Sequence, residues 1–502
     1  MRSRAHPGLV LAAPPAGEDL GKDAPLTSVR QPGQTWRDHL VMLLGIAAEV
    51  EHGLMVQYLY AAYSLGGPQV EGPEQRAMIR KWRAALIKVA TEEMGHLVTV
   101  QNILTLLGAP VALGREDYPW DLPYYPFPFV LEPLTKSSLA CYIHAEMPPH
   151  VMEMLDKYPS LPRRLQQFKD ETWREVETLV HARVPHALPA VAVIYDEIIA
   201  LVRDEDRIPD EAFDEGSYAA QASWDDWGRG HGAKRKLLDP EGSVIEAPDQ
   251  PPPHEGQAHV LVLQAATRTQ ALAALHAISG QGEAPHLDPH DGAEPSHFER
   301  FLHIFQDFPD PKEWVPARRL AINPTTRSDT GSPPERGHVS TYGSHQTYIA
   351  AKHTREWALL SNIRYRLLLS YITLSFRLAR GGRGGAPDLR GMTMHRVFGE
   401  MYNIKTIAGI LTELPLDPDE APGPKMEVAG PPFEMPYALR LPDGDRDAWR
   451  VLRDLLDGSV DLAGGLLPDA TGAAAGYLQA LIELDRQAMA WMDAIIAGRA
   501  EA

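Results

Sequence analysis

The stretch VATEEMGHLVTVQNIL, residues 89–104, places two adjacent glutamates and a histidine inside a segment with the pattern of a core-facing helix. On a helix, positions three, four and seven residues apart lie on one face. The positions around Glu93 hold Leu86, Val89, Ala90, Leu97 and Val100, together with His96. The positions around Glu92 include Lys88, Gly95 and Thr99. We therefore expect Glu93 and His96 to point together into the interior, and Glu92 to be partly exposed.

Two further predicted helices each carry one enclosed glutamate. The positions around Glu51 hold Leu44, Ala47, Ala48, Leu54, Met55 and Tyr58. The positions around Glu197 hold Ala190, Val193, Ile194, Ala200 and Leu201, whereas its neighbour Asp196 shares a face with Arg203. An ionised carboxylate without partners in an apolar interior costs several kcal/mol. Such a group must take up a proton or bind a cation.

A pair of divalent metal ions would satisfy these carboxylates together. Bundles that hold two iron or two manganese ions use one glutamate from each of two helices and a Glu-x-x-His from each of the other two. The stretch quoted above supplies one such motif, and AEPSHFERFLHIF offers the second in Glu294 and His297. Pro295 is expected at the first position of that helix. Glu283, in SGQGEAPH just upstream, is an alternative to Glu294.

The Glu-x-x-His motif alone carries little weight. It occurs five times, at Glu49/His52, Glu93/His96, Glu283/His286, Glu294/His297 and Glu335/His338. A chain with this many histidines contains about one or two by chance, and a single motif on a helix more often forms a local salt bridge. The metal site is inferred from the combination of apolar surroundings, helix number and order along the chain. The predicted ligands are Glu51, Glu93, His96, Glu197, Glu294 and His297.

Composition excludes several other classes of site. The chain of 502 residues has a formal net charge of −19, which disfavours binding to a phosphate backbone. Cys141 is the only cysteine, so neither a disulfide within the chain nor a cysteine-based zinc site can form. With 20 histidines available, a metal would be held by imidazole and oxygen ligands. No window holds the roughly 18 continuous apolar residues of a membrane span, and we predict a cytoplasmic protein.

The pattern along the chain is mainly helical, with weak strand signals and long loops. Helices are predicted near 35–65, 73–107, 136–147, 161–182, 185–203, 266–279, 295–307, 346–380, 391–413, 445–457 and 472–498. We divide the chain into a disordered leader at 1–34, a helical bundle at 35–310 and a helical C-terminal region at 311–502 packed on the bundle. Within the bundle, residues 205–258 are polar and are predicted to form an insertion with little core.

Several segments resemble a known family. EVEHGLMVQYLYAAYSL, VATEEMGHLVTVQNILTLLGAP, IYDEII, QGEAP, SHFERF, MYNIKTIAGIL and AGPPFEMP occur in the order found in the ferritin-like family of the iminophenyl-pyruvate dimer synthases, of the violacein-pathway type. The resemblance covers roughly residues 36–435. The first two segments and SHFERF are the most specific, and the others support them by their order. The chain is similar, more broadly, to the ferritin-like di-metal carboxylate proteins.

The resemblance implies a ferritin-like four-helix bundle with additional C-terminal helices and long ordered loops. Carried over by position, the family's motif residues are Glu51, Glu93, His96 and His297. Where family members often read SIGEFYEAI, this chain reads AVAVIYDEI, so that Val193 replaces an acid. Glu197, one turn later on the same face, or Glu146 in CYIHAEMPP, would take its place.

Together these features predict an oxidative enzyme of secondary metabolism with a carboxylate-bridged di-metal centre. Two iron ions are expected, with manganese as the alternative because both metals accept these ligands, and dioxygen or peroxide is the expected co-substrate. Characterised family members couple two imine forms of an aromatic 2-oxo acid, which implies a small aromatic or amino-acid-derived substrate here. No nucleic-acid or membrane partner is expected, and assembly into a homo-oligomer is left open. The alternative prediction is a non-catalytic or metal-storing bundle.

Overall fold

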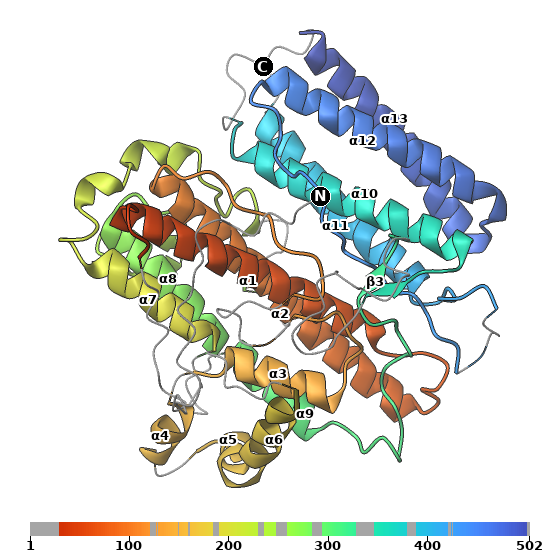
Figure 1. Ribbon diagram of the computed structural model, residues 1–502, viewed down its shortest axis with the longest axis horizontal. Helices are drawn as coiled ribbons and strands as arrows, with labels where there is room; N and C mark the ends of the chain where they lie inside the picture. The colour runs from red at the N-terminus through yellow and green to blue at the C-terminus, as the bar shows by residue number, and fades with distance from the viewer. Residues whose placement is uncertain are drawn as a thin grey trace.

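The computed structural model describes most of the chain between residues 30 and 498. The described residues are 30–120, 127, 129–148, 150–158, 161–183, 190–228, 235–246, 259–283, 294–327, 346–378, 388–419, 423 and 425–498. Most of the predicted leader and part of the predicted insertion lie outside them. Within them the fold is mainly α, as the sequence predicts (Figure 1).

Two long helices, α1 (Trp36–Ser64) and α2 (Pro73–Leu106), lie side by side at the centre of the bundle (Figure 1). At the start of α1, the Thr35 hydroxyl accepts a hydrogen bond from the backbone N–H of Asp38, and the Asp38 carboxylate accepts one from that of Thr35. This capping box satisfies two N–H groups that the helix leaves unpaired. Pro73 opens α2, where its missing N–H is not needed. Both helices therefore begin where the sequence predicts.

Two further helices complete the four-helix arrangement. α7 (Val191–Arg203) packs on α1 and on α8 (Arg268–Glu283), and α8 also contacts α2. α3 (Lys136–Glu146) and α9 (His297–Gln306) pack against each other beside the α1–α2 pair (Figure 1). The smaller elements between α3 and α7 are α4 (Val151–Asp156), α5 (Arg163–Gln167), a π-helical turn at Phe168–Thr172, and α6 (Trp173–Arg183).

Residues 259–263 form a strap of irregular backbone along α2, directly after the insertion. The hydroxyl of Thr99 donates a hydrogen bond to the carbonyl oxygen of Leu261. A Cβ at Gly95 would lie 2.9 Å from the same oxygen, so a glycine is needed where the strap approaches the helix. A face of α2 that looks polar in the sequence is therefore covered by backbone from a distant segment.

The described part of the insertion is better packed than predicted. Trp227 is fully buried and contacts Phe398, and Asp226 pairs with Arg390. Phe398 and Arg390 lie on α11 (Leu389–Leu411). The prediction of little core is wrong here, because this segment docks on the C-terminal helices. The short strands are β1 (Lys236–Leu238), antiparallel to β2 (Val244–Glu246), and β3 (Pro324–Thr325), parallel to β4 (Thr347–Tyr348).

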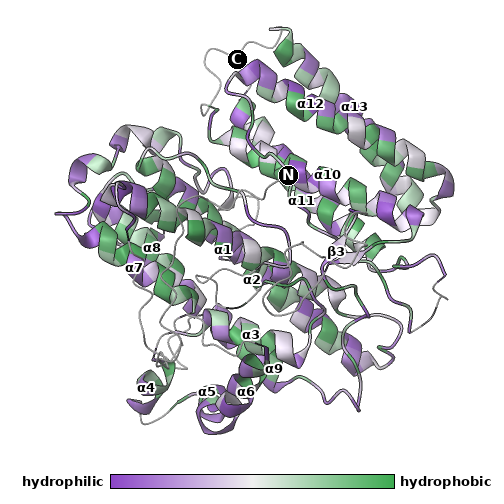
Figure 2. Ribbon diagram, in the orientation of Figure 1, coloured by the Kyte–Doolittle hydropathy of each residue, from purple (hydrophilic) through white to green (hydrophobic). Residues whose placement is uncertain are grey.

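The C-terminal helices α10 (Lys352–Ser375), α11, α12 (Asp445–Leu466) and α13 (Gly472–Ile496) form a second group beside the bundle (Figure 1). Figure 2 shows hydrophilic and hydrophobic residues alternating along α12 and α13, as expected of helices with one face in solvent. α12 does not end near residue 457 as predicted but continues to Leu466, because Ala463 and Leu466 are buried in this group. Their packing outweighs the low helix propensity of the neighbouring glycines.

One buried guanidinium joins all four of these helices. Arg364 on α10 has a fully buried side chain whose Nη1 lies 3.0 Å from Oδ1 of Asp485 on α13 and 3.2 Å from Oε1 of Glu400 on α11. Its Nη2 donates to the hydroxyl of Ser459 on α12. The paired charges satisfy one another in an interior where an unpaired charge would be very unfavourable.

α1 is long and apolar enough to span a membrane, with a mean hydropathy of 1.4 in its most apolar window, yet 72% of that window is buried inside the protein. The helix is enclosed on several sides. α2 and α7 pack on it from the bundle, and His52 on α1 contacts the hydroxyl of Tyr365 on α10. Residues of α1 and α10 belong to one continuous apolar core, which accounts for the composition of α1.

Candidate metal centre

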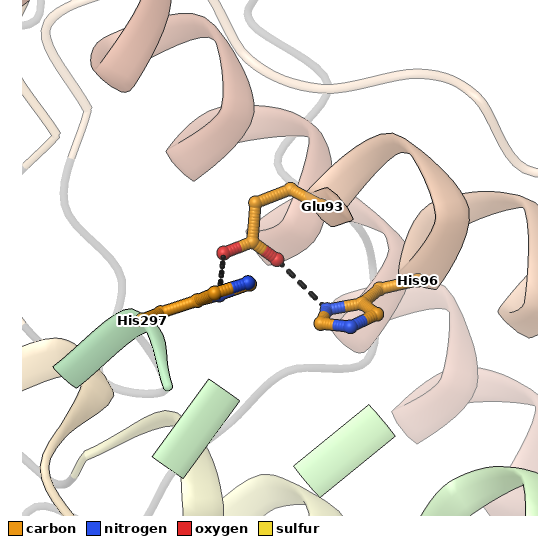
Figure 3. A group of neighbouring side chains, drawn as sticks. All are labelled: Glu93, His96 and His297. Atoms are coloured by element: carbon orange, nitrogen blue, oxygen red, sulfur yellow. Dashed lines mark hydrogen bonds and ion pairs between the residues drawn. The ribbon is translucent and has the colours of Figure 1, made fainter. Parts of the chain in front are cut away.

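Two histidines and a glutamate from α2 and α9 meet in the interior of the bundle (Figure 3). Ligand atoms of Glu93, His96 and His297 lie within 4.8 Å of one another, and all three side chains are buried. His96 lies one turn after Glu93 on α2. His297 is the first residue of α9, and the hydroxyl of its N-cap Ser296 accepts a hydrogen bond that fixes the start of that helix. The sequence predicted these three residues as ligands, and the fold brings them together.

The carboxylate of Glu93 lies between the two imidazoles (Figure 3). Its Oε2 is 2.9 Å from Nδ1 of His96, and its Oε1 is 2.8 Å from Nδ1 of His297. The two rings are stacked with their centroids 5.4 Å apart. Because each oxygen of Glu93 faces a different histidine, this carboxylate has the geometry to bridge two ions that each bind one imidazole.

Glu51 on α1 and Glu146 at the end of α3 flank this centre on two sides. Oε2 of Glu51 lies 3.6 Å from Nδ1 of His96, and Oε2 of Glu146 lies 3.6 Å from Nδ1 of His297. The Oε1 atom of each carboxylate accepts a hydrogen bond from a buried phenol. The donors are Tyr195 of α7 for Glu51 and Tyr58 of α1 for Glu146. One oxygen of each carboxylate is thus held in place while the other faces the centre.

Glu283, the last residue of α8, is the fourth buried carboxylate of the site. It lines a small cavity together with Glu51, Glu93, His96 and Glu146. Burial raises the pKa of Glu283 well above its ordinary value, and the negative charges of Glu146 and Glu51 raise it further. A Cβ at Gly282 would lie 3.2 Å from Oε2 of Glu146, so a larger residue would press on that carboxylate. Glu283 therefore lies near both flanking carboxylates, where it could bind the same cation as they do.

Clustering also shifts the pKa values of the other groups. Burial and the nearby charge of Glu93 raise the pKa of Glu51 to about 7. Burial opposes protonation of His96, but hydrogen bonds to Glu51 and Glu93 raise its pKa to about 10. The pKa of His297 is also raised, against the effect of burial, mainly by the charge of Glu93. Without a cation, the site therefore holds several protons at neutral pH.

These side chains fit a pair of metal ions. Four carboxylates and two imidazoles are the donor set of the di-iron and di-manganese bundles. Oε1 of Glu93 and Nδ1 of His297 are buried and lack a hydrogen-bond partner among the described residues, although they lie 2.8 Å apart. Such unsatisfied buried atoms are rare in folded proteins, and an ion bound by both would satisfy them.

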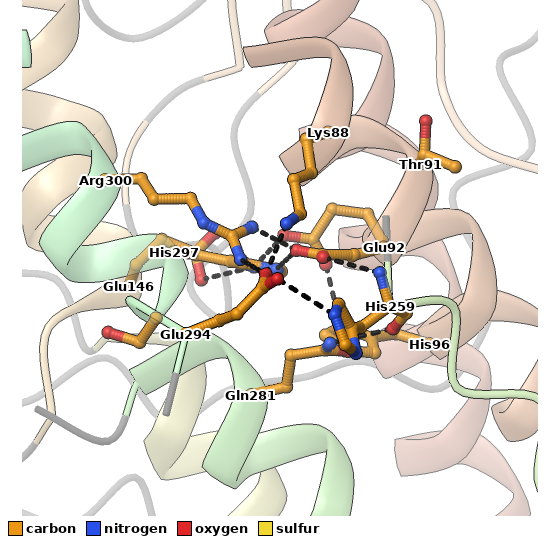
Figure 4. Close-up of polar contacts among 12 residues, drawn as sticks. Lys88, Thr91, Glu92, His96, Glu146, His259, Gln281, Glu294, His297 and Arg300 are labelled. Carbon is orange, nitrogen blue, oxygen red and sulfur yellow. Dashed lines mark hydrogen bonds and ion pairs between the residues drawn. The ribbon is translucent and has the colours of Figure 1, made fainter. Parts of the chain in front are cut away.

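The outward-facing nitrogens of the two histidines are bound as well (Figure 4). Nε2 of His297 lies 3.0 Å from Oε2 of Glu92, and Nε2 of His96 lies 3.0 Å from Oε1 of Gln281. Each imidazole consequently turns its Nδ1 toward the centre. Outer hydrogen bonds of this kind fix the orientation and tautomer of metal-binding histidines.

The prediction that Glu92 is partly exposed is wrong, because its side chain is fully buried. The strap at 259–263 covers its side of α2, and the backbone N–H of His259 donates to Oε1 of Glu92. Burial opposes ionisation of this carboxyl, but the hydrogen bond to His297 and the charge of Arg300 hold its pKa well below its usual range. The pattern of helical neighbours therefore assigned Glu92, a residue of the candidate site, to the wrong environment.

Glu294, predicted as a ligand, lies at the edge of the site instead. Its side chain is 42% exposed. It forms ion pairs with Lys88, His259 and Arg300. α9 begins at His297 after the N-cap Ser296, so Pro295 is not its first residue and Glu294 is not on the helix. The spacing of a helical Glu-x-x-His therefore does not apply to this pair.

Glu197, the other predicted ligand that the fold does not bring to the centre, is half-buried on α7. The cavity is lined from α7 by Val191 and Tyr195, and Glu197 is not among its lining residues. The two alternatives named from the sequence, Glu146 and Glu283, lie at the centre in place of Glu197 and Glu294.

A family model described as Ferritin-like matches residues 44–306. The chain is 24% identical over 432 residues to the dichlorochromopyrrolate synthase of Lentzea aerocolonigenes, a match that covers 80% of this chain and 36% of that protein. It is 32% identical over 130 residues to the 2-imino-3-(indol-3-yl)propanoate dimerase of Chromobacterium violaceum, covering 20% of this chain and 12% of that protein. These matches span little more than a third of the first relative and a smaller part of the second.

Among solved structures, a ferritin-like protein from Caulobacter vibrioides aligns with 76% of this chain and 98% of its own. The alignment has a TM-score of 0.39 and 15% sequence identity. The fold assignment therefore depends on the family match and on the helices themselves.

Proposed function

Because this chain belongs to the ferritin-like family, we propose that it is an oxidative enzyme of secondary metabolism with a carboxylate-bridged pair of metal ions. The family resemblance predicted from the sequence is confirmed by the family match and by the two named relatives, which are both enzymes. The observation that carries the proposal is the position of Glu93, with one oxygen directed at each of two buried imidazoles.

The ligands would divide into two sets around Glu93. His96 and Glu51 would bind one ion, and His297 and Glu146 the other. Glu93 would bridge the two ions, and Glu283 would close the site from α8. This assignment uses every carboxylate of the cavity and matches the donor set of known di-metal bundles.

A pair of iron ions, or of manganese ions, would supply the redox centre for oxidation by dioxygen or peroxide. The chain itself would hold that centre rigidly and keep it dry. Tyr195 and Tyr58 each hold one oxygen of a flanking carboxylate, so Glu51 and Glu146 would present only the other oxygen. Leu54, Val191 and Ile278 line the cavity with apolar surface and would exclude water around the reacting group.

The substrate would be a small amino-acid-derived imine or an aromatic 2-oxo acid. The support is sequence similarity to the named relatives, one of which is a dimerase of 2-imino-3-(indol-3-yl)propanoate. The most specific form of the proposal is that this chain alone couples two such molecules. The matched region is a minor part of each relative, so this coupling has to be tested on this chain itself.

Metal uptake is expected to release protons. Ligands must lose their protons to bind a metal ion, and His96, with a pKa of about 10, is protonated at pH 7. Adding Zn²⁺ to metal-free protein in weakly buffered solution at pH 7 should therefore acidify it by more than one proton per chain. Affinity should rise between pH 6 and 8 as protons compete less. Zinc binding with no change in pH would contradict this protonation state.

The same pKa shifts predict how the metal-free protein responds to pH. Both His96 and Glu51 have raised pKa values, at about 10 and about 7. At these two sites the folded chain binds more protons than the unfolded chain, so the stability that they contribute is lost as pH rises from about 5 to 10. Thermal unfolding of metal-free protein across this range measures the effect. The change in unfolding temperature with pH should be smaller after metal loading.

Two measurements on the purified protein test the proposed function. Elemental analysis after reconstitution should give about two metal ions per chain, and less than one would reject the di-metal site. Consumption of dioxygen should then depend on added substrate, tested with imines and 2-oxo acids of the aromatic amino acids. Metal loading with no substrate-dependent consumption would favour the alternative of a metal-storing bundle.

A further inference from the structure

The two histidines of the site have outer partners of different charge. Nε2 of His297 meets the carboxylate of Glu92, whereas Nε2 of His96 meets the neutral amide of Gln281, and both distances are 3.0 Å. A hydrogen bond with an ionised acceptor is roughly twice as strong as one between neutral groups. An outer acceptor raises the basicity of a ligand imidazole. We therefore expect His297 to be the stronger metal ligand of the two histidines.

The direction of both hydrogen bonds follows from their surroundings. The Nε2 atom of Gln281 donates to the backbone carbonyl of His259 at 2.8 Å, so the Oε1 atom must face His96 as an acceptor. An ionised Glu92 has no proton to donate. In the neutral form that binds a metal ion, the remaining proton of each histidine therefore lies on Nε2, and Nδ1 is the atom left for the ion.

His259 in the strap fixes both outer partners at once. Its backbone N–H donates to Oε1 of Glu92 at 2.9 Å, while its carbonyl oxygen accepts from Gln281. A single peptide segment thereby sets the spacing between the acceptor of one histidine and that of the other. Figure 4 shows these groups converging from α2, α8, α9 and the strap.

Glu92 lies in a cluster of charged side chains. Arg300 donates to Oε2 of Glu92 and, through Nη2, to Oε2 of Glu294 at 3.2 Å. Lys88 and His259 form ion pairs with Glu294. Gln281, by contrast, contacts His96 and the carbonyl oxygen of His259 through an amide that is neutral at any pH.

We propose that the two metal positions are inequivalent: the position at His297 binds its ion more tightly and fills first, and Glu92 and Gln281 set this difference. Glu92 and Gln281 are positioning residues, since each acts through a histidine. The inference rests on the proposed function only in requiring that the site take two ions.

Calorimetric titration of metal-free protein with Zn²⁺ tests the inference. Wild-type protein should bind two ions in steps whose dissociation constants differ by about 10- to 100-fold, the usual effect of an outer partner. Glu92→Gln should weaken only the tighter step by a similar factor, so that the steps merge. Gln281→Leu should weaken only the second step. Glu294→Gln is the matched control, because it makes the same chemical change at the exposed end of the cluster and should alter neither constant more than about twofold.

A second readout identifies which histidine fills first. In protein labelled with ¹⁵N-histidine, one equivalent of Zn²⁺ should shift the ring signals of His297 and leave those of His96 unchanged, with the signals assigned by His297→Gln. In Glu92→Gln both sets should shift together. A purely structural role of Glu92 would change the stability of the protein but not this order.

The outcomes separate this inference from the proposed function. Wild-type protein that binds no Zn²⁺ overturns both. Two ions bound with equal constants, or steps that Glu92→Gln leaves unchanged, overturn the inference alone. If circular dichroism shows that Glu92→Gln does not fold, Gln281→Leu decides: weakening of the second step alone supports the inference, and any other pattern overturns it.

Discussion

Replacing Glu93 with alanine is expected to remove both metal ions from the protein. Each oxygen of this carboxylate faces a different imidazole, at 2.9 Å from His96 and 2.8 Å from His297. Its loss would take one ligand from each ion of the proposed pair and leave Glu51 and Glu146 without a group between them. Metal content should fall from about two ions per chain to well below one, and any metal-dependent oxidation should fall with it.

Elemental analysis of protein purified and reconstituted in parallel measures this effect. Glu197→Gln is the matched control, since it alters a half-buried glutamate of α7 that does not line the cavity. The control should keep its metal. Circular dichroism establishes that both variants fold. Unchanged metal content in folded Glu93→Ala would assign this glutamate to structure alone.

Replacing Arg364 with methionine is expected to destabilise the C-terminal helices by about 3 to 5 kcal/mol, the effect of removing one partner of a buried ion pair. Asp485 and Glu400 would then lie unpaired in an interior where both side chains are almost fully buried. Burial already raises the pKa of Glu400, and loss of the guanidinium would raise it further. Urea unfolding monitored by helical circular dichroism measures the change.

Two comparisons make the Arg364 result specific. Arg453→Met removes a partly exposed arginine that pairs with Asp457 and Asp493 on the surface, and should cost about 1 kcal/mol or less. The triple variant Arg364→Met, Glu400→Gln, Asp485→Asn removes the charges together and should recover part of the lost stability. A single variant as stable as wild type would show that the buried network does not hold the four helices together.

Much of the fold could be predicted from local signals. The limits of α1 and α2 follow from Thr35, from Pro73 and from the GGP turn between the helices. These signals work because they satisfy or omit backbone donors within a few residues. The extension of α12 past residue 457 could not be predicted in this way, because the burial of Leu466 depends on α10, α11 and α13.

The candidate site was predictable where its residues lie in the middle of long helices. Glu51, Glu93 and His96 have complete rings of helical neighbours, so their apolar surroundings can be counted. Glu146 and Glu283 are each the last residue of a helix, where half of that ring is missing. They could be named from the sequence only as alternatives.

Two errors have the same physical origin. The ring around Glu197 is apolar, but Ala200 in that ring is exposed, so the ring does not place Glu197 in the interior. The ring around Glu92 contains Gly95 and Thr99, yet both lie under the strap at 259–263. In each case the surroundings of the helix face depend on how the rest of the chain packs, and the periodicity of one helix does not contain this information.

The enclosure of α1 bears on whether the bundle can be produced as a fragment. One flank of α1 is covered by α2 and α7, and the other shares its apolar core with α10. A fragment ending at residue 310 would expose that second flank, on a helix apolar enough to enter a lipid bilayer. Aggregation or recovery with membranes is the expected fate of such a fragment. The chain therefore cannot be shortened at the end of the bundle, because α1 also needs the C-terminal helices to cover it.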